Sequence, residues 1–97
     1  MATENLDRVR ELALDLATEK PRSPREELGG FELAARALDK CRATLAGTPG
    51  DFQFNCPMDQ QFFSATGIVA DEFKQFVATG ADDSAVDAWV REHAKAG

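Results

Sequence analysis

The sequence has few of the side chains that bind metals. It contains one histidine, His93, and two cysteines, Cys41 and Cys56, among 97 residues. These three side chains alone cannot complete the four-ligand shell of a structural zinc site. The two cysteines lie far apart and form no C-x-x-C pair. We therefore expect no metal site, and we expect both thiols to remain free in a reducing cytoplasm.

Long apolar runs and glycine-rich loops are also missing. No stretch is apolar over a length that would cross a bilayer, and no signal peptide is recognisable. Gly29-Gly30 alone does not make a phosphate-binding loop, and the chain has no internal repeat. The sequence therefore predicts a cytoplasmic protein with no membrane contact and no bound cofactor.

Positive charge is in the minority. The formal net charge of −6 argues against nucleic acid or an anionic membrane as the main partner, because both require a basic face. A chain of 97 residues with 43% hydrophobic content is long enough for a modest core. We expect one acidic domain spanning residues 1–97, either monomeric or homodimeric.

Apolar residues recur at spacings of three and four along most of the chain, which predicts a compact all-α fold. The five expected helices cover residues 4–18, 31–46, 57–66, 70–79 and about 83–94. Thr3 is the expected cap of the first helix, whose apolar face would pack on the core or serve a partner or dimer contact. Cys41 lies on the apolar stripe of the second helix, and Trp89 is the expected core anchor of the last.

Two connectors separate these helices. Ser23-Pro24-Arg25-Glu26 has the form of a capping box with proline at the first helical position, which predicts a short extra helical turn. Residues 48–55 contain turn formers and are expected to be irregular or extended. Phe52 and Phe54 alternate within this second connector, so both are expected to face inward.

The densest group of chemically distinctive residues is Asn55-Cys56-Pro57-Met58-Asp59-Gln60. Pro57 is placed to start a helix, and Asp59 then falls in its first turn, where the helix dipole favours a carboxylate. A thiol at a helix start can have a lowered pKa, which makes Cys56 a candidate nucleophile. The alternative is that Cys56 is a small buried hydrophobic residue, as free cysteines often are.

Several segments together resemble the DUF5069 family, a family of small bacterial proteins of unassigned function. The similar segments are Pro21-Arg22-Ser23-Pro24-Arg25, Leu28-Gly29-Gly30, Leu38-Asp39-Lys40, Arg42-Ala43, Leu45-Ala46-Gly47-Thr48, Gly50, Asn55-Cys56-Pro57, Asp59-Gln60, Gly67-Ile68, Ala70-Asp71-Glu72-Phe73 and Trp89-Val90. The resemblance spans about residues 14–90, and Val69 departs from the aspartate expected at its position. It implies a compact helical domain without naming an activity. It also implies that the family's recurring pattern includes Lys40, Arg42, Asn55, Cys56, Asp59 and Gln60, which we take as the candidate ligand-binding residues.

Three functions are compatible with these observations. The first is a binding or interaction module for a small anionic ligand or a protein partner, in which Lys40 and Arg42 attract an anion to the helix start at Pro57. The second is a thiol-dependent enzyme or redox sensor that uses Cys56 as its nucleophile. The third is purely structural, with the polar residues of the central stretch serving only as caps and turn formers.

Overall fold

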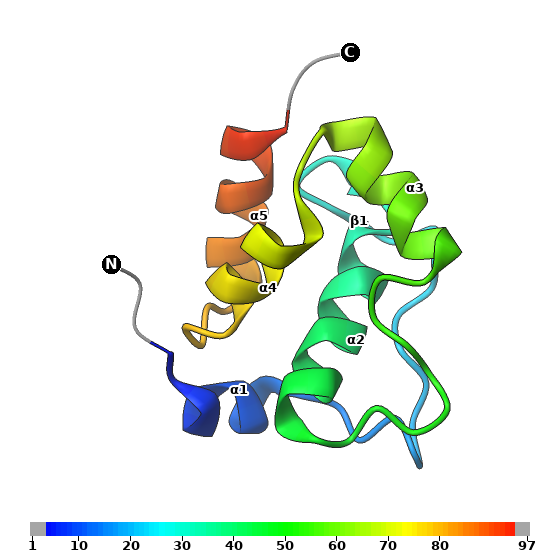
Figure 1. The fold of residues 1–97 in the computed structure, drawn as a ribbon, viewed down its shortest axis with the longest axis vertical. Coiled ribbons are helices and arrows are strands. Elements are labelled where there is room, and N and C mark those ends of the chain that lie inside the picture. The colour runs from blue at the N-terminus through cyan, green and yellow to red at the C-terminus, as the bar shows by residue number, and fades with distance from the viewer. Residues whose placement is uncertain (1–3, 95–97) are drawn as a thin grey trace.

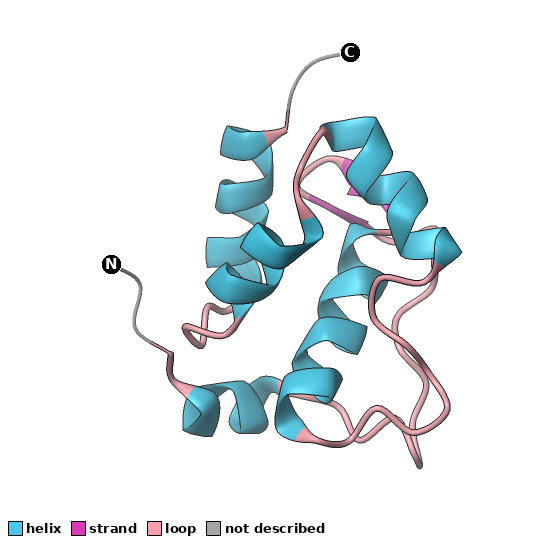
Figure 2. Ribbon diagram, viewed as in Figure 1, coloured by secondary structure: helices cyan, strands magenta, loops and turns pink. Residues whose placement is uncertain are grey.

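The computed structural model describes residues 4–94, which form a mostly helical globule (Figures 1 and 2). The elements are α1 (Leu6–Leu12), β1 (Glu27–Leu28), β2 (Phe31–Glu32), α2 (Ala34–Ala46), α3 (Pro57–Thr66), α4 (Ala70–Val77) and α5 (Asp83–His93). Within residues 4–94 there are five helices, which confirms the predicted fold class. Helix α2 is central: α1 packs near its C-terminal end, and the connector after α2 runs back along it to the start of α3 (Figure 1).

The first helix is much shorter than predicted. It ends at Leu12, and Ala13 already has extended backbone with ψ of 144°. The reason is tertiary: the Leu16 N–H donates to Thr48 O at 2.9 Å, and Thr48 Oγ1 donates to Leu14 O at 3.2 Å. These bonds hold residues 14–16 against the connector after α2 in place of a continued helix. Asn5 caps α1 by accepting from the Arg8 N–H, and the predicted cap Thr3 lies outside the described residues.

The capping box at Ser23 forms a turn and not a helix. Ser23 Oγ accepts from the Arg25 N–H at 3.1 Å, and the Glu26 N–H donates to Ser23 O at 3.0 Å. The chain then makes a small antiparallel hairpin, which the sequence reading missed, with Leu28 paired to Phe31. Its two-residue turn is Gly29-Gly30, with φ of 64° and 85°. Glycines with positive φ at both central positions are typical of a tight hairpin turn.

This hairpin also changes the start of the second helix. Phe31 was expected to be helical, but it lies in β2, and α2 begins at Ala34 after Leu33. Leu33 has φ of 73°, a left-handed conformation that is rare for a leucine. From that point the helix matches its predicted course, and it ends as predicted at Gly47, which has φ of 79°.

The core lies between α2 and the three later helices. Leu38 and Cys41 of α2 are fully buried, so the predicted core position of Cys41 is confirmed. They belong to a cluster with the aromatic rings of Phe62, Phe63 and Phe73, whose centroids lie 5.1 to 6.0 Å apart. Such edge-to-face aromatic packing adds to the stabilisation that comes from burial alone.

The connector of residues 48–55 is irregular, as predicted, but its two phenylalanines behave differently. Phe54 packs inward against Phe63 and Phe73. Phe52 instead lies beneath the Arg36 guanidinium, 5.5 Å from it, in a cation–π contact. The alternation therefore predicted the inward position of Phe54 correctly but not that of Phe52, because the Phe52 ring contacts the Arg36 guanidinium instead.

The last three helices follow the sequence closely. Helix α3 begins at Pro57 and ends before Gly67, and α5 is capped by Asp82, whose carboxylate accepts from the Ala85 N–H at 2.8 Å. Helix α4 is two residues shorter than predicted. Trp89 is only partly buried, at the edge of the core, where it stacks on Phe76 and on the exposed His93.

Candidate functional site

The middle of α2 and the first turn of α3 meet through a buried ion pair. Lys40 Nζ lies 2.9 Å from Asp59 Oδ1, and the two side chains are only 3% and 1% exposed. This oxygen has no hydrogen bond of regular geometry among the described residues, so the contact is an ion pair with poor alignment. Two charges removed from water to this extent are costly unless they remain together. The pair therefore fixes how the start of α3 sits on α2.

The backbone before α3 is held by the same carboxylate. Asp59 Oδ2 accepts from the Asn55 N–H at 2.9 Å, and Gln60 Nε2 donates to Asn55 O at 3.2 Å. Asn55 has φ of 63°, a left-handed conformation that asparagine tolerates better than most residues. Asp59 thus contacts both the turn at Asn55 and the ammonium of Lys40, whereas the exposed side chain of Gln60 contacts only the turn.

Cys56 lies next to this ion pair, at the cap position of α3. Its Sγ is 3.0 Å from Lys40 Nζ, and the residue is partly exposed, not the buried hydrophobic residue of the alternative reading. Partial burial and the charge of the Asp59 carboxylate act to raise the pKa of the Cys56 thiol, but the hydrogen bond from Lys40 and the N–H groups of Asp59 and Met58 outweigh them and lower the pKa. The side chain makes no regular cap hydrogen bond, so the ammonium is the main stabilising group.

The second cysteine has the opposite environment. Cys41 is fully buried, and burial raises the pKa of its thiol to about 12. A thiol with so little thiolate at neutral pH is inert. The two cysteines therefore differ in chemistry as well as in position, with Cys56 the one that has both access to solvent and a cation beside its sulfur.

Arg42 is not brought to this cluster. It is two residues from Lys40 on α2, and residues two apart on a helix do not share a face. Its guanidinium binds Asp83 Oδ1 at 2.8 Å and Ala81 O at 2.9 Å. The structure therefore joins Lys40, Asn55, Cys56, Asp59 and Gln60 and places Arg42 in a second polar group, so Lys40 and Arg42 do not act together at the start of α3 as predicted. Whether any of the six binds a ligand stays a prediction.

The second polar group was not foreseen. Arg22 donates to both carboxylate oxygens of Asp39 at 3.0 Å and to Asp83 Oδ2 at 2.9 Å. Burial acts to raise the pKa of Asp83, but its hydrogen bonds with Arg42 and Arg22 outweigh this effect and lower it. No sequence pattern links these residues, which lie on three separate segments. These ion pairs connect the segment before the hairpin to α2 and to the start of α5.

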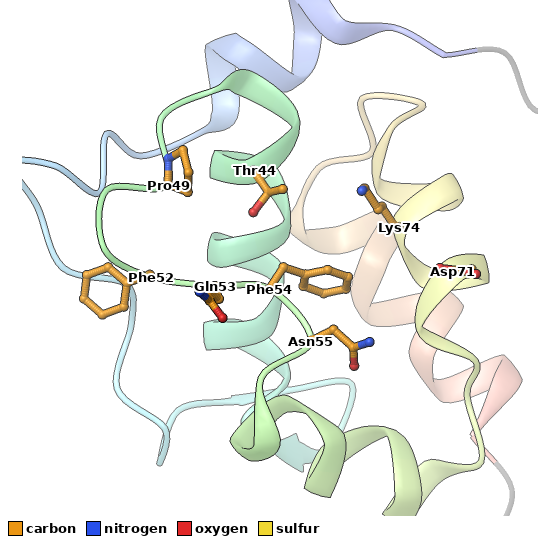
Figure 3. Close-up of a pocket in the computed structure, with 8 residues that line it drawn as sticks. All are labelled: Thr44, Pro49, Phe52, Gln53, Phe54, Asn55, Asp71 and Lys74. Carbon is orange, nitrogen blue, oxygen red and sulfur yellow. The ribbon is translucent and has the colours of Figure 1, made fainter.

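A pocket of about 460 Å³ opens beside the start of α3 (Figure 3). Its lining residues are Thr44, Pro49, Phe52, Gln53, Phe54, Asn55, Asp71 and Lys74. The side chains of Phe54 and Asn55 point toward α4, where Asp71 and Lys74 lie (Figure 3). Its volume is within the range of small-molecule sites. Of the residues predicted from sequence only Asn55 reaches it, and the contribution of α4 was missed because only the folded chain brings α4 close.

Residues 4–94 contain neither a metal-binding cluster nor a membrane-spanning helix. No three histidine, cysteine, aspartate or glutamate side chains in this part of the chain gather as a metal site would require. Among the described helices, none combines the length and apolarity needed to traverse a bilayer.

Comparison with known proteins identifies the family of this chain. No curated protein is matched. A family model described as a domain of unknown function, DUF5069, matches residues 18–97. The match covers most of the chain, including both helices of the Lys40–Cys56–Asp59 cluster and every residue of the pocket. The chain belongs to the DUF5069 family.

Proposed function

We propose that this protein is a thiol-based redox-responsive protein in which Cys56 is the reacting group. The observation that carries the proposal is the 3.0 Å contact between Lys40 Nζ and Cys56 Sγ. A thiolate is the reactive form of cysteine, and an adjacent cation stabilises it. The partial exposure of Cys56 gives an oxidant or an electrophile access to the sulfur.

The reaction requires no additional catalytic residue. The thiolate attacks one oxygen of a peroxide, the O–O bond breaks, and the hydroxide released takes up a proton to become water. The sulfur is oxidised by two electrons to a sulfenic acid while the peroxide is reduced. A separate general base is not part of this proposal, because the contact with Lys40 favours the thiolate form of the attacking sulfur. This feature favours redox sensing over a thiol enzyme, which would also need groups for substrate turnover.

The proposal predicts a lowered titration midpoint for Cys56. In a Cys41→Ala background, the alkylation rate of the folded protein should rise to its plateau with a midpoint below the value of ~8.5 for a free thiol. The same protein unfolded in urea is the matched control, because it keeps the sequence and loses the Lys40 contact. A folded midpoint at or above that of the unfolded chain, or very slow alkylation in the folded state, would reject the proposal.

A second candidate function is supported by the pocket beside α3. A binding module for a small anionic ligand would use the ammonium of Lys74 and the amide of Asn55, which both line the pocket. Lys40 is less suited to this role, because its charge is directed at Asp59 and Cys56. Titration with inorganic phosphate, followed by amide NMR, should give saturable shifts around Asn55 that Lys74→Ala removes. Shifts that do not saturate would contradict anion binding here.

A further inference from the structure

Lys40 and Cys56 are held as a reactive pair. Nζ lies 3.0 Å from Sγ, and the lysine side chain is only 3% exposed, so the packing of α2 against α3 keeps it from turning into solvent. Most lysines avoid this situation by extending their ammonium into water. The amine closest to the sulfur is therefore fixed in place before any oxidation occurs.

Asp59 supplies the third group that a condensation needs. Its Oδ1 lies 2.9 Å from Nζ, is fully buried and has no regular hydrogen bond among residues 4–94. An ammonium cannot act as a nucleophile until it loses a proton. The carboxylate oxygen paired with it is in position to accept that proton.

We propose that oxidation of Cys56 by hydrogen peroxide leads to a covalent bond between Cys56 Sγ and Lys40 Nζ, a sulfenamide crosslink between α3 and α2. This inference rests on the proposed function, because the first step is the formation of the Cys56 sulfenic acid. It adds a modification site that ties the redox state of the sulfur to the join between two helices.

The second step balances within the three side chains. Nζ passes one proton to Asp59 and attacks Sγ, the S–O bond breaks, and the departing hydroxide leaves as water with a second proton from the nitrogen. The sulfenic acid, the ammonium and the carboxylate thus give the S–N bond, one water and a protonated Asp59. Sulfenic acids undergo this kind of condensation with nitrogen nucleophiles. Two equivalents of a thiol would reverse it, giving the free cysteine, the free lysine and one disulfide.

The test uses the full chain with Cys41→Ala, which removes a disulfide as an alternative product of similar mass. Hydrogen peroxide should lower the intact mass by about 2 Da relative to the reduced protein, because the crosslink removes two hydrogens. Trypsin should then release residues 37–42 joined to residues 43–74, since the modified Lys40 is not cleaved. Treatment with a thiol reductant should separate the two peptides.

Lys40→Arg is the decisive variant, because it keeps a cation near the sulfur but a guanidinium does not condense with a sulfenic acid. It should give no linked peptides, and the sulfenic acid should instead be trapped by dimedone. Lys20→Arg makes the same change at an exposed lysine and should leave the crosslink intact.

Each failure has a distinct meaning. If peroxide alone gives no linked peptides while a parallel sample with dimedone gives the Cys56 adduct, the crosslink is overturned and the proposed redox function stands. The absence of both products after peroxide treatment would reject the proposed function and the crosslink with it. Linked peptides about 14 Da heavier than the reduced pair would carry one added oxygen, and fragment ions that place this oxygen between nitrogen and sulfur would overturn the direct S–N bond.

Discussion

Lys40 is the residue on which the candidate site depends. Its ammonium is almost fully buried and has two close partners, the carboxylate of Asp59 and the sulfur of Cys56. A buried charge is tolerated when it is paired, and removal of one partner leaves the other uncompensated. The same side chain thus contributes to stability through Asp59 and to reactivity through Cys56.

Lys40→Met should destabilise the fold by about 3 to 5 kcal/mol, the usual cost of breaking a buried ion pair. Urea unfolding measures this loss. Lys40→Met combined with Asp59→Asn should be less destabilised than Lys40→Met alone, because no charge then remains buried and the amide oxygen can still accept from the Asn55 N–H.

Lys20→Met provides the baseline for that comparison, since Lys20 is exposed and makes no ion pair among the described residues. It should change the free energy of unfolding by no more than about 0.5 kcal/mol. If the losses in unfolding free energy of the single variants Lys40→Met and Asp59→Asn simply add up in the double variant, the two side chains are not coupled.

Among the elements, the hairpin of β1 and β2 lies in close contact with α5. The Gly29 N–H donates to Asp87 Oδ2 on α5 at 2.7 Å. A Cβ atom at Gly29 would lie 2.6 Å from Val90 Cγ1, whereas a Cβ at Gly30 would meet nothing closer than Arg91 Nη1 at 3.6 Å. The hairpin therefore lies directly on α5, and its first glycine makes this close approach possible.

Gly29→Ala and Gly30→Ala form a matched pair at the level of this element. Both place alanine at a positive φ, which costs about 1 to 2 kcal/mol. Gly29→Ala should cost about 1 to 3 kcal/mol more, because its methyl group also overpacks against Val90. Thermal or urea unfolding of the two variants gives the difference directly, and equal losses would mean that α5 moves away without cost.

At the scale of the whole molecule, two polar groups join segments that are distant in the chain. The Lys40–Cys56–Asp59 cluster links α2 to α3, and the group around Arg22 and Asp83 links residues before the hairpin to α2 and α5. Both groups include charged side chains of α2 that are almost fully buried. The central helix therefore organises polar contacts as well as the apolar core.

Local signals predicted the parts of the fold that are governed by local physics. Pro57 at the start of α3 and Gly47 at the end of α2 each act within one helical turn, so the neighbouring residues suffice to predict them. The helical reading failed at residues 13–18 and at Phe31. There, hydrogen bonds to the connector at Thr48 or across the hairpin compete with the helix, and the sequence does not reveal those partners.

The candidate site, too, was predicted from the sequence only where its contacts are local. Sequence spacing alone indicated that Cys56 and Asp59 share a helix start, but the grouping of Arg42 with Lys40 at that start did not hold, because residues two apart on a helix do not share a face. It could not show that Lys40 faces Cys56, because that contact joins residues 16 positions apart and depends on how α2 packs against α3. The pocket and the presence of Lys74 in its lining could not be predicted for the same reason.

By itself, then, the sequence determined the helical class, most helix ends, the buried place of Cys41 and the helix-start place of Cys56, since each follows from periodicity or from contacts within a turn. The packing of α2 against α3, in contrast, leaves Cys56 partly exposed beside a buried ammonium whose charge Asp59 balances. The physical reason is that the pKa and reactivity of a thiol depend on charges within a few ångströms. Those charges come from a second helix whose position is set by the packing of the whole core.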